Sequence, residues 1–191
     1  MVGLSSVIYE LDVLYLDGLE YEVCVSEDFM NNEYSYSTLA KICNKSGEIL
    51  GKQKYEYVIS CVPHLKKWID SILTFDCAIN NHDRHLDNFT VKLNKDSIEP
   101  CLCYDFGDSL FSTFKTIELK KVLDMPLNYT QSKPFGSIHS AQIKYIGDTF
   151  LLPVRIVDVY KLVNSYLDAE RAKWINKWLI LRLKELNLTK N

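Results

Sequence analysis

Three oxygen-bearing side chains in the middle of the sequence have the types and order that suit a phosphate-bound magnesium ion. They are Asp83, Asn88 and Asp105, and Asp105 begins the triplet D-F-G. Magnesium takes oxygen ligands and commonly uses one or two protein side chains beside phosphate oxygens. Asn88 and Asp105 could supply those ligands, and Asp83 could accept a proton from an attacking hydroxyl. The segment therefore carries residues suited to phosphoryl transfer.

Two predicted elements would bring these side chains together. Apolar residues recur at helical spacing over residues 65–79, and this helix would lead directly into Asp83. Residues 89–104 then read as a β-hairpin with a turn near its middle. The hairpin would return Asp105 to its own starting point, next to Asn88, so both side chains could share one ion.

The same segment resembles the catalytic loop of HipA-like bacterial kinases, including the shorter CtkA-like members. The stretch NNHDRHLDNFTV, followed by YDFGDSL, has the family's order N-x-D-R-H-x-x-N, with the arginine after the aspartate. The resemblance implies that Asp83 is the catalytic base. It also implies that Asn88 and Asp105 hold Mg²⁺. We expect Arg84 and His85 to support the loop, through hydrogen bonds or a pairing with a carboxylate or substrate group.

Two further segments extend the resemblance over most of the chain. CVSEDFM, residues 24–30, looks like the family's hinge, which implies that the backbone of Glu27, Asp28 and Phe29 lies against the adenine of ATP. SKPFG, residues 132–136, looks like a recurring segment of the large lobe. The implied activity is transfer of the ATP γ-phosphate to a serine or threonine of a protein substrate. In the family this implies a toxin, often with a small DNA-binding antitoxin as partner.

The predicted fold class is α+β and protein-kinase-like. Alternating apolar residues on both sides of Asp17-Gly18 predict a short N-terminal antiparallel β-hairpin. We expect residues 1–30 to be a remnant of the kinase small lobe with its hinge. Residues 31–191 would then form the large catalytic lobe, a mainly α-helical region that carries the catalytic β-hairpin.

Later helices are predicted over residues 114–123, 140–150 and 153–166. The clearest one follows Asp168, a suitable N-cap, and carries a stripe of tryptophan, isoleucine and leucine that we expect to pack in the core.

The sequence departs from the kinase pattern before the hinge. No lysine precedes Lys41, and no glycine-rich loop occurs there to cover the ATP phosphates. Losing such charge stabilisation often costs several kcal/mol of barrier, so we expect weak or absent activity from this chain alone. Three explanations stay open: a split kinase completed by a separate small-lobe polypeptide, a truncated copy, or a pseudokinase that serves as a non-catalytic interaction module.

A small-molecule phosphotransferase of the aminoglycoside type is a further alternative, because such enzymes share the loop aspartate, the asparagine and the second aspartate. The D-R-H order favours the protein kinase. A net charge of −3 gives no general attraction to nucleic acid, and no apolar run is long enough for a membrane span. Six scattered cysteines without a C-x-x-C pair predict buried free thiols and a cytoplasmic location.

Structural interpretations are also favoured for Asp76, for two histidines of the loop and for Lys133. Asp76 lies on the apolar face of the predicted helix, and we expect it to hydrogen-bond to the catalytic loop. His82 and His85 form an H-x-x-H pair, but a zinc site is disfavoured because no cysteine partner lies nearby. For Lys133, a solvated side chain is favoured over a phosphate contact.

Overall fold

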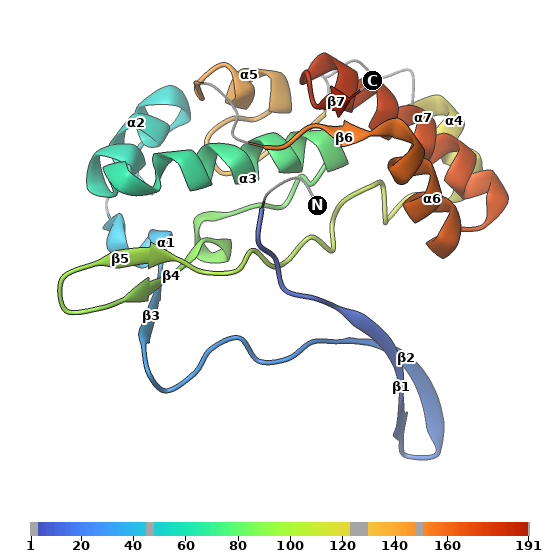
Figure 1. Cartoon of the computed structure of the whole chain (residues 1–191), viewed down its shortest axis with the longest axis horizontal. Helices are drawn as coiled ribbons and strands as arrows, with labels where there is room; N and C mark the ends of the chain where they lie inside the picture. Colours follow the sequence, from blue (N-terminus) through green and yellow to red (C-terminus); the bar gives the residue numbers. More distant parts are fainter. Residues whose placement is uncertain (1–3, 45–47, 123–129, 148–150, 191) are drawn as a thin grey trace.

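In the computed structural model, which describes residues 4–44, 48–122, 130–147 and 151–190, the N-terminal hairpin forms as predicted. β1 (Glu10–Leu16) and β2 (Leu19–Val25) pair antiparallel. Asp17 and Gly18 both have positive φ, 52° and 77°, which matches the turn to the twist of the strands. Figure 1 shows the hairpin projecting from the rest of the chain, and its sheet has two strands in the described part.

The predicted second hairpin also forms, and it belongs to a larger sheet. β4 (Thr90–Leu93) pairs antiparallel with β5 (Ile98–Pro100). β3 (Ser35–Thr38), which was not predicted, pairs with the other edge of β4. β5 stops at its proline, which has no N–H for the ladder, but the Cys101 amide still donates to the Thr90 carbonyl at 3.1 Å. The chain is thereby guided back toward the start of the hairpin.

Helix α3 (Lys66–Ile79) is the central element of the body and confirms the predicted helix. A short 3₁₀ segment, η2 (Pro63–Leu65), precedes it, so helical structure begins at the predicted proline. The helix ends where Asn80 takes a left-handed conformation with φ 55°, which asparagine tolerates at a helix C-terminus. Ile72 and Leu73 on its inner face are buried in the main core.

Two helices between the N-terminal hairpin and η2 were not predicted from the sequence. They are α1 (Leu39–Ile42) and α2 (Gly51–Cys61). α2 begins at a glycine, has no side-chain cap, and within its length buries only Tyr55 and Val58. Its apolar periodicity is therefore too weak to identify from sequence, and packing against the core holds the helix in place.

The C-terminal part is mainly helical, as predicted, with small differences. Its elements are α4 (Thr116–Val122), α5 (His139–Ile143), β6 (Val154–Arg155), α6 (Ile156–Tyr166), α7 (Ala169–Glu185) and β7 (Thr189–Lys190). α7 begins as predicted, because the Asp168 carboxylate accepts a hydrogen bond from the Arg171 amide at 2.9 Å. Ile175 and Trp178 of its apolar stripe are buried. The helix predicted over residues 140–150 ends early, at Ile143, and residues 148–150 lie outside the described ranges.

The described chain thus combines small sheets with several helices, in agreement with the α+β prediction. In Figure 1 the helices gather on one side, the three-stranded sheet lies below α3, and the N-terminal hairpin stands apart. None of the described helices is long and apolar enough to cross a membrane. The division into residues 1–30 and 31–191 stays a prediction.

Candidate active site

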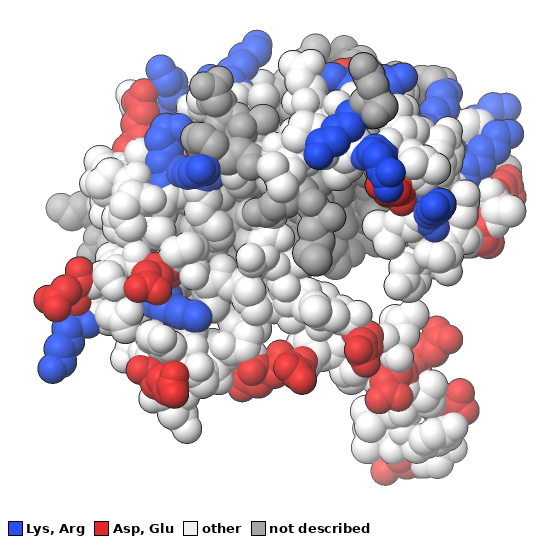
Figure 2. Space-filling model, viewed as in Figure 1, with Lys and Arg blue, Asp and Glu red and all other residues white. Residues whose placement is uncertain are grey.

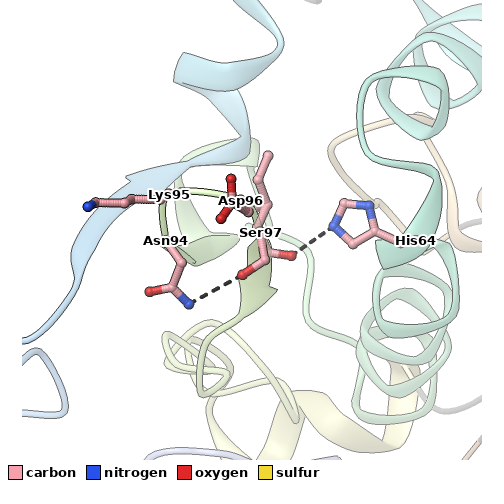
Figure 3. A pocket seen from close by; sticks show the side chains of 6 residues that line it. His64, Asn94, Lys95, Asp96 and Ser97 are labelled. Carbon is pink, nitrogen blue, oxygen red and sulfur yellow. Dashed lines mark hydrogen bonds between the residues drawn. The ribbon is translucent and has the colours of Figure 1, made fainter.

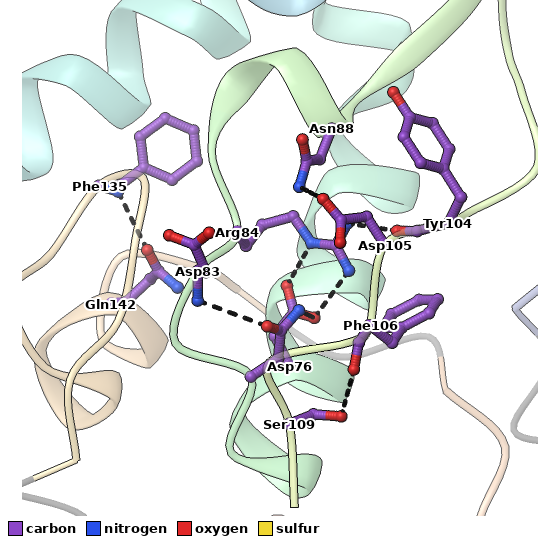
Figure 4. Close-up of polar contacts among 11 residues, drawn as sticks. Asp76, Asp83, Arg84, Asn88, Tyr104, Asp105, Phe106, Ser109, Phe135 and Gln142 are labelled. Atoms are coloured by element: carbon purple, nitrogen blue, oxygen red, sulfur yellow. Dashed lines mark hydrogen bonds and ion pairs between the residues drawn. The ribbon is translucent and has the colours of Figure 1, made fainter. Parts of the chain in front are cut away.

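Asn88 and Asp105 lie side by side, as the predicted hairpin requires. Asn88 ends the short 3₁₀ segment η3 (Leu86–Asn88) before β4, and Asp105 lies where the chain returns from β5. The Asn88 amide nitrogen donates to Asp105 Oδ2 at 2.5 Å (Figure 4). Asp105 has φ 59°, a left-handed conformation that aspartate tolerates better than most residues. The two side chains are thus adjacent, with the amide nitrogen facing the carboxylate. A half-turn of the amide would place its oxygen there instead, and one carboxylate with one amide oxygen is a donor set that fits Mg²⁺ with phosphate and water completing its shell.

Arg84 joins the loop between α3 and β4 to α3 through a fully buried ion pair. Its Nε donates to Asp76 Oδ2 at 2.9 Å, and its Nη2 donates to Asp76 Oδ1 at 3.0 Å. Its Nη1 donates to the Tyr104 carbonyl at 2.7 Å, directly before Asp105. Burial by itself would lower the pKa of Arg84, but the charge and hydrogen bonds of Asp76 outweigh it and raise that pKa. The predicted partner of Asp76 is therefore found in the loop, and one guanidinium holds three segments together.

Further contacts complete this buried support. The Asn81 side-chain amide donates to Asp76 Oδ1 at 2.8 Å, which fixes the start of the loop. The Arg84 guanidinium carbon lies 4.6 Å from the centroid of the Phe106 ring, within cation–π distance. Phe106 in turn meets Phe75 of α3 edge to face, with centroids 5.4 Å apart. The aromatic residue of the D-F-G triplet thus packs beneath the arginine and limits where Asp105 can lie.

Asp83 lies on the surface of the loop, next to Arg84 in the sequence. Its carboxylate is half exposed and receives a hydrogen bond from Lys133 Nζ at 2.6 Å. That hydrogen bond holds the pKa of Asp83 below its usual value, against a smaller opposing effect of burial. Figure 4 shows Asp83 and the Asn88–Asp105 pair on either side of Arg84. Lys133 is thus exposed, as a solvated side chain would be, and it is also an ion-pair partner of the predicted base.

The two histidines of the loop have different partners. His82 Nε2 lies 2.7 Å from Asp108 Oδ2, which ties the loop between α3 and β4 to the segment after the D-F-G triplet. His85 Nδ1 lies 3.8 Å from Asp87 Oδ2, too far for a hydrogen bond. Across the described ranges, no group of three or more histidine, cysteine or acidic side chains is placed to hold a metal ion.

The predicted adenine-binding segment reaches the same region through Phe29. Its ring lies 5.6 Å, centroid to centroid, from that of Tyr104, the neighbour of Asp105. Tyr104 is itself fixed, because its hydroxyl lies 2.7 Å from Thr90 Oγ1. Glu27 and Asp28 are exposed. The structure brings this segment close to the candidate site, and its role toward adenine stays a prediction.

Two hollows of the described surface lie elsewhere. One, of about 520 Å³, is lined by His64 and the β4–β5 turn (Figure 3). A neighbouring hollow of about 770 Å³ is lined by residues of the N-terminal segment, α3 and β5. Neither is lined by Asp83, Asn88 or Asp105. In Figure 3 the His64 ring points at the β4–β5 turn, and its Nε2 lies 2.8 Å from the Ile98 carbonyl, so this ring braces the hairpin.

Two contacts of the site were not identified from sequence. Lys133 was considered only as a phosphate contact or a solvated residue, since fifty positions separate it from Asp83. Tyr9, just before β1, lies with its hydroxyl 3.5 Å from the Asp105 amide nitrogen. Only the SKPFG resemblance pointed toward Lys133, and no sequence signal pointed toward Tyr9.

Comparison with known proteins supports a kinase-like fold. The chain is similar to the crystal structure of the proinflammatory kinase CtkA from Helicobacter pylori, with a TM-score of 0.71. The similarity covers 98% of this chain and 76% of that chain at 16% sequence identity. No protein-family profile matches the sequence, and no curated protein matches it. At this identity the likeness concerns the fold alone.

Proposed function

We propose that this chain carries the catalytic lobe of a HipA-like protein serine/threonine kinase, which transfers the γ-phosphate of ATP to a protein hydroxyl with Mg²⁺. The observation that carries the proposal is the Asn88–Asp105 pair, held in register by the buried Arg84–Asp76 ion pair beside a half-exposed Asp83. Phosphoryl transfer needs positioning and charge neutralisation more than covalent chemistry. A rigid ligand pair next to an ionised carboxylate suits that need.

Each residue would have a separate task. Asn88 and Asp105 would hold Mg²⁺, which when bound neutralises charge on the ATP phosphates. Asp83 would accept the proton of the attacking hydroxyl, and its lowered pKa keeps it ionised at neutral pH. Glu27, Asp28 and Phe29 would line the adenine side of the nucleotide through their backbone. Arg84 would keep Asp105 facing Asn88, and His85 would lie at the edge of the loop.

The N-terminal hairpin supports a proposal for the partner of this kinase. β1 and β2 carry Glu10, Asp12, Glu20 and Glu22 and no lysine or arginine, and Figure 2 shows acidic and uncharged side chains there. Apolar side chains such as Tyr15 are also exposed. A second copy is disfavoured because two acidic hairpins would repel. We propose a basic small-lobe polypeptide that adds a strand to this hairpin.

The reading frame upstream of the gene tests whether the added strand comes from a separate polypeptide or from the same chain. A separate frame encoding a glycine-rich loop and a strand lysine would support a split kinase. A continuous frame would place the same elements in one chain. A neighbouring frame for a small DNA-binding protein would support a toxin–antitoxin pair.

The kinase proposal is tested by Mg²⁺-dependent transfer of labelled γ-phosphate to a protein extract. The chain alone is expected to be weakly active at most, and the chain with its small-lobe partner active. Asp83→Ala should abolish transfer, and Asp105→Asn should also abolish Mg²⁺-dependent ATP binding. An exposed acidic residue far from the site, Glu56→Gln on α2, serves as the control. Robust transfer by the isolated chain would contradict the expected dependence on a partner.

A non-catalytic interaction module is the second candidate. It is favoured by the exposed hairpin and by the lack of a lysine before Lys41 in the sequence. Under this candidate the chain binds a partner through β1–β2, while Asp83→Ala and Asp105→Asn leave every measured property unchanged. Transfer to an aminoglycoside and not to protein would instead support the small-molecule phosphotransferase.

A further inference from the structure

The turn that carries Lys133 is anchored on both sides of the lysine. Ser132 and Phe135 are buried, at 4% and 2% exposure, whereas Lys133 between them is exposed. The Phe135 amide donates to Gln142 Oε1 at 3.0 Å, and Figure 4 shows this bond on the Asp83 side of the site. A Cβ added at Gly136 would lie only 3.2 Å from the Gln142 backbone nitrogen, so a side chain there has little room. The turn is therefore fixed to the body, and the lysine alone reaches outward.

The position of the ammonium group relative to Asp83 restricts what it can contact. Lys133 Nζ lies 2.6 Å from Asp83 Oδ1. A general base must lie within about 3 Å of the hydroxyl it deprotonates, and that oxygen must lie within about 3.5 Å of the attacked phosphorus. A group hydrogen-bonded to the base is thus within reach of the phosphoryl oxygens. An ammonium has three N–H donors, and Asp83 uses one of them.

We propose that Lys133 is a catalytic residue of this site, which binds the phosphoryl group during its transfer while it orients Asp83. The inference rests on the proposed phosphoryl transfer and assigns the Lys133 ammonium as a further positive group of that site. This charge comes from the turn of Phe135, which packs in the same hydrophobic core as Phe89, next to the proposed metal ligand Asn88. Negative charge that develops on the equatorial oxygens would be met by the two N–H groups that Asp83 does not use.

Binding of a transition-state analogue tests the proposal without requiring turnover. The chain, with its small-lobe partner if one is found, is titrated with Mg²⁺·ADP and with Mg²⁺·ADP plus aluminium fluoride. Lys133→Met is expected to weaken binding of the fluoride complex by about 100-fold and to leave Mg²⁺·ADP binding unchanged, because the lysine contacts only the group that aluminium fluoride mimics. Lys133→Arg should recover most of the loss. Lys52→Met, which removes an exposed lysine from an ion pair on α2, is the matched control.

The possible outcomes separate this proposal from the one on which it rests. Equal binding of the fluoride complex by wild type and Lys133→Met would overturn the role of Lys133 and leave the kinase proposal standing. A wild-type chain that binds neither complex with its partner present would overturn both. A loss that affects Mg²⁺·ADP as strongly as the fluoride complex would also overturn the role, since it would show a general effect on the nucleotide site.

A carboxyl NMR titration of Asp83 tests the contact itself in solution. The positive groups that lower the pKa of Asp83 are Lys133, by hydrogen bond and charge, and then His85 and His82. In Lys133→Met this pKa should rise toward the ordinary aspartate value, and in Lys52→Met it should not change. An unchanged pKa in Lys133→Met would mean that the ion pair does not form in solution, and the proposal would fall.

Discussion

The two β-hairpins of this chain have very different surroundings. In β4–β5 the strand residue Val91 and the preceding Phe89 are fully buried, and a third strand and α3 support the hairpin. In β1–β2 the apolar residues Leu14, Tyr15 and Leu19 are 50%, 70% and 59% exposed. A two-stranded hairpin without such support is marginally stable in water. The predicted metal ligands and the predicted base thus stand on a packed body, while the adjoining hairpin is largely exposed.

This difference explains how the Asn88–Asp105 pair can be held firmly although the β1–β2 hairpin beside it is largely exposed. The geometry of Asn88 and Asp105 depends on contacts among residues 76 to 106, all within the body. The hairpin reaches the site only at its base, where the Tyr9 hydroxyl lies 3.5 Å from the Asp105 amide. Changes in the body should therefore affect both stability and site, whereas changes in the hairpin should affect neither strongly.

The largest effect is expected when the buried ion pair of the body is broken. Arg84→Met leaves Asp76 as an uncompensated buried charge, which typically costs about 3–5 kcal/mol in free energy of unfolding. Urea denaturation monitored by tryptophan fluorescence should show this loss as a lower midpoint with the same slope.

The double variant Arg84→Met/Asp76→Leu is the control for the Arg84 prediction. It removes both charges and should recover much of the stability, since no charge is left buried alone. Mg²⁺-dependent nucleotide binding should stay lost in both variants, because the link to the Tyr104 carbonyl is absent. Equal stability of wild type and Arg84→Met would contradict the idea that this pair holds the body together.

A smaller effect on the free energy of unfolding is expected from pH, and it again arises in the body, at His139. Burial, followed by the charges of Arg182 and His82, lowers the pKa of His139 from 6.5 to about 3. Below pH 6.5 the unfolded chain therefore binds a proton that the folded chain does not bind. Stability should fall with pH from 6.5 toward 3, by at most about 1.4 kcal/mol per pH unit from this group. The comparison is between melting curves at pH 7 and pH 5.

His139→Gln is the variant that isolates the pH effect, and His64→Gln, a change of an exposed histidine, is its control. His139→Gln should reduce the change in stability between pH 7 and pH 5, and His64→Gln should leave that change as in the wild type. A wild-type stability that is constant over this interval would show that His139 is not buried in its neutral form.

Both hairpins were predictable from the sequence, whereas several elements of the body were not. Asp83, Asn88 and Asp105 were recognisable because they lie close together in the sequence. Alternating apolar residues and a turn also predicted the hairpin that joins Asn88 to Asp105. α2 was missed because Gly51 and a missing cap hide its start, and β3 because its four residues are defined only by pairing with β4. The Lys133–Asp83 contact joins positions far apart in the chain, and only the packing of the Phe135 turn brings them together.

The smallest effect is expected from polar substitutions on the N-terminal hairpin. Leu14→Thr and Leu19→Thr change side chains that are already half exposed, so each should alter the free energy of unfolding by less than about 0.5 kcal/mol. Leu73→Ala, in the fully buried face of α3, is the matched control and should cost about 2–5 kcal/mol.

Hydrogen exchange should give β1–β2 amides opening free energies near zero and α3 amides values close to that of global unfolding. Strong protection of β1–β2 in the isolated chain would mean that the hairpin is already covered, and the proposed strand partner would lose its basis.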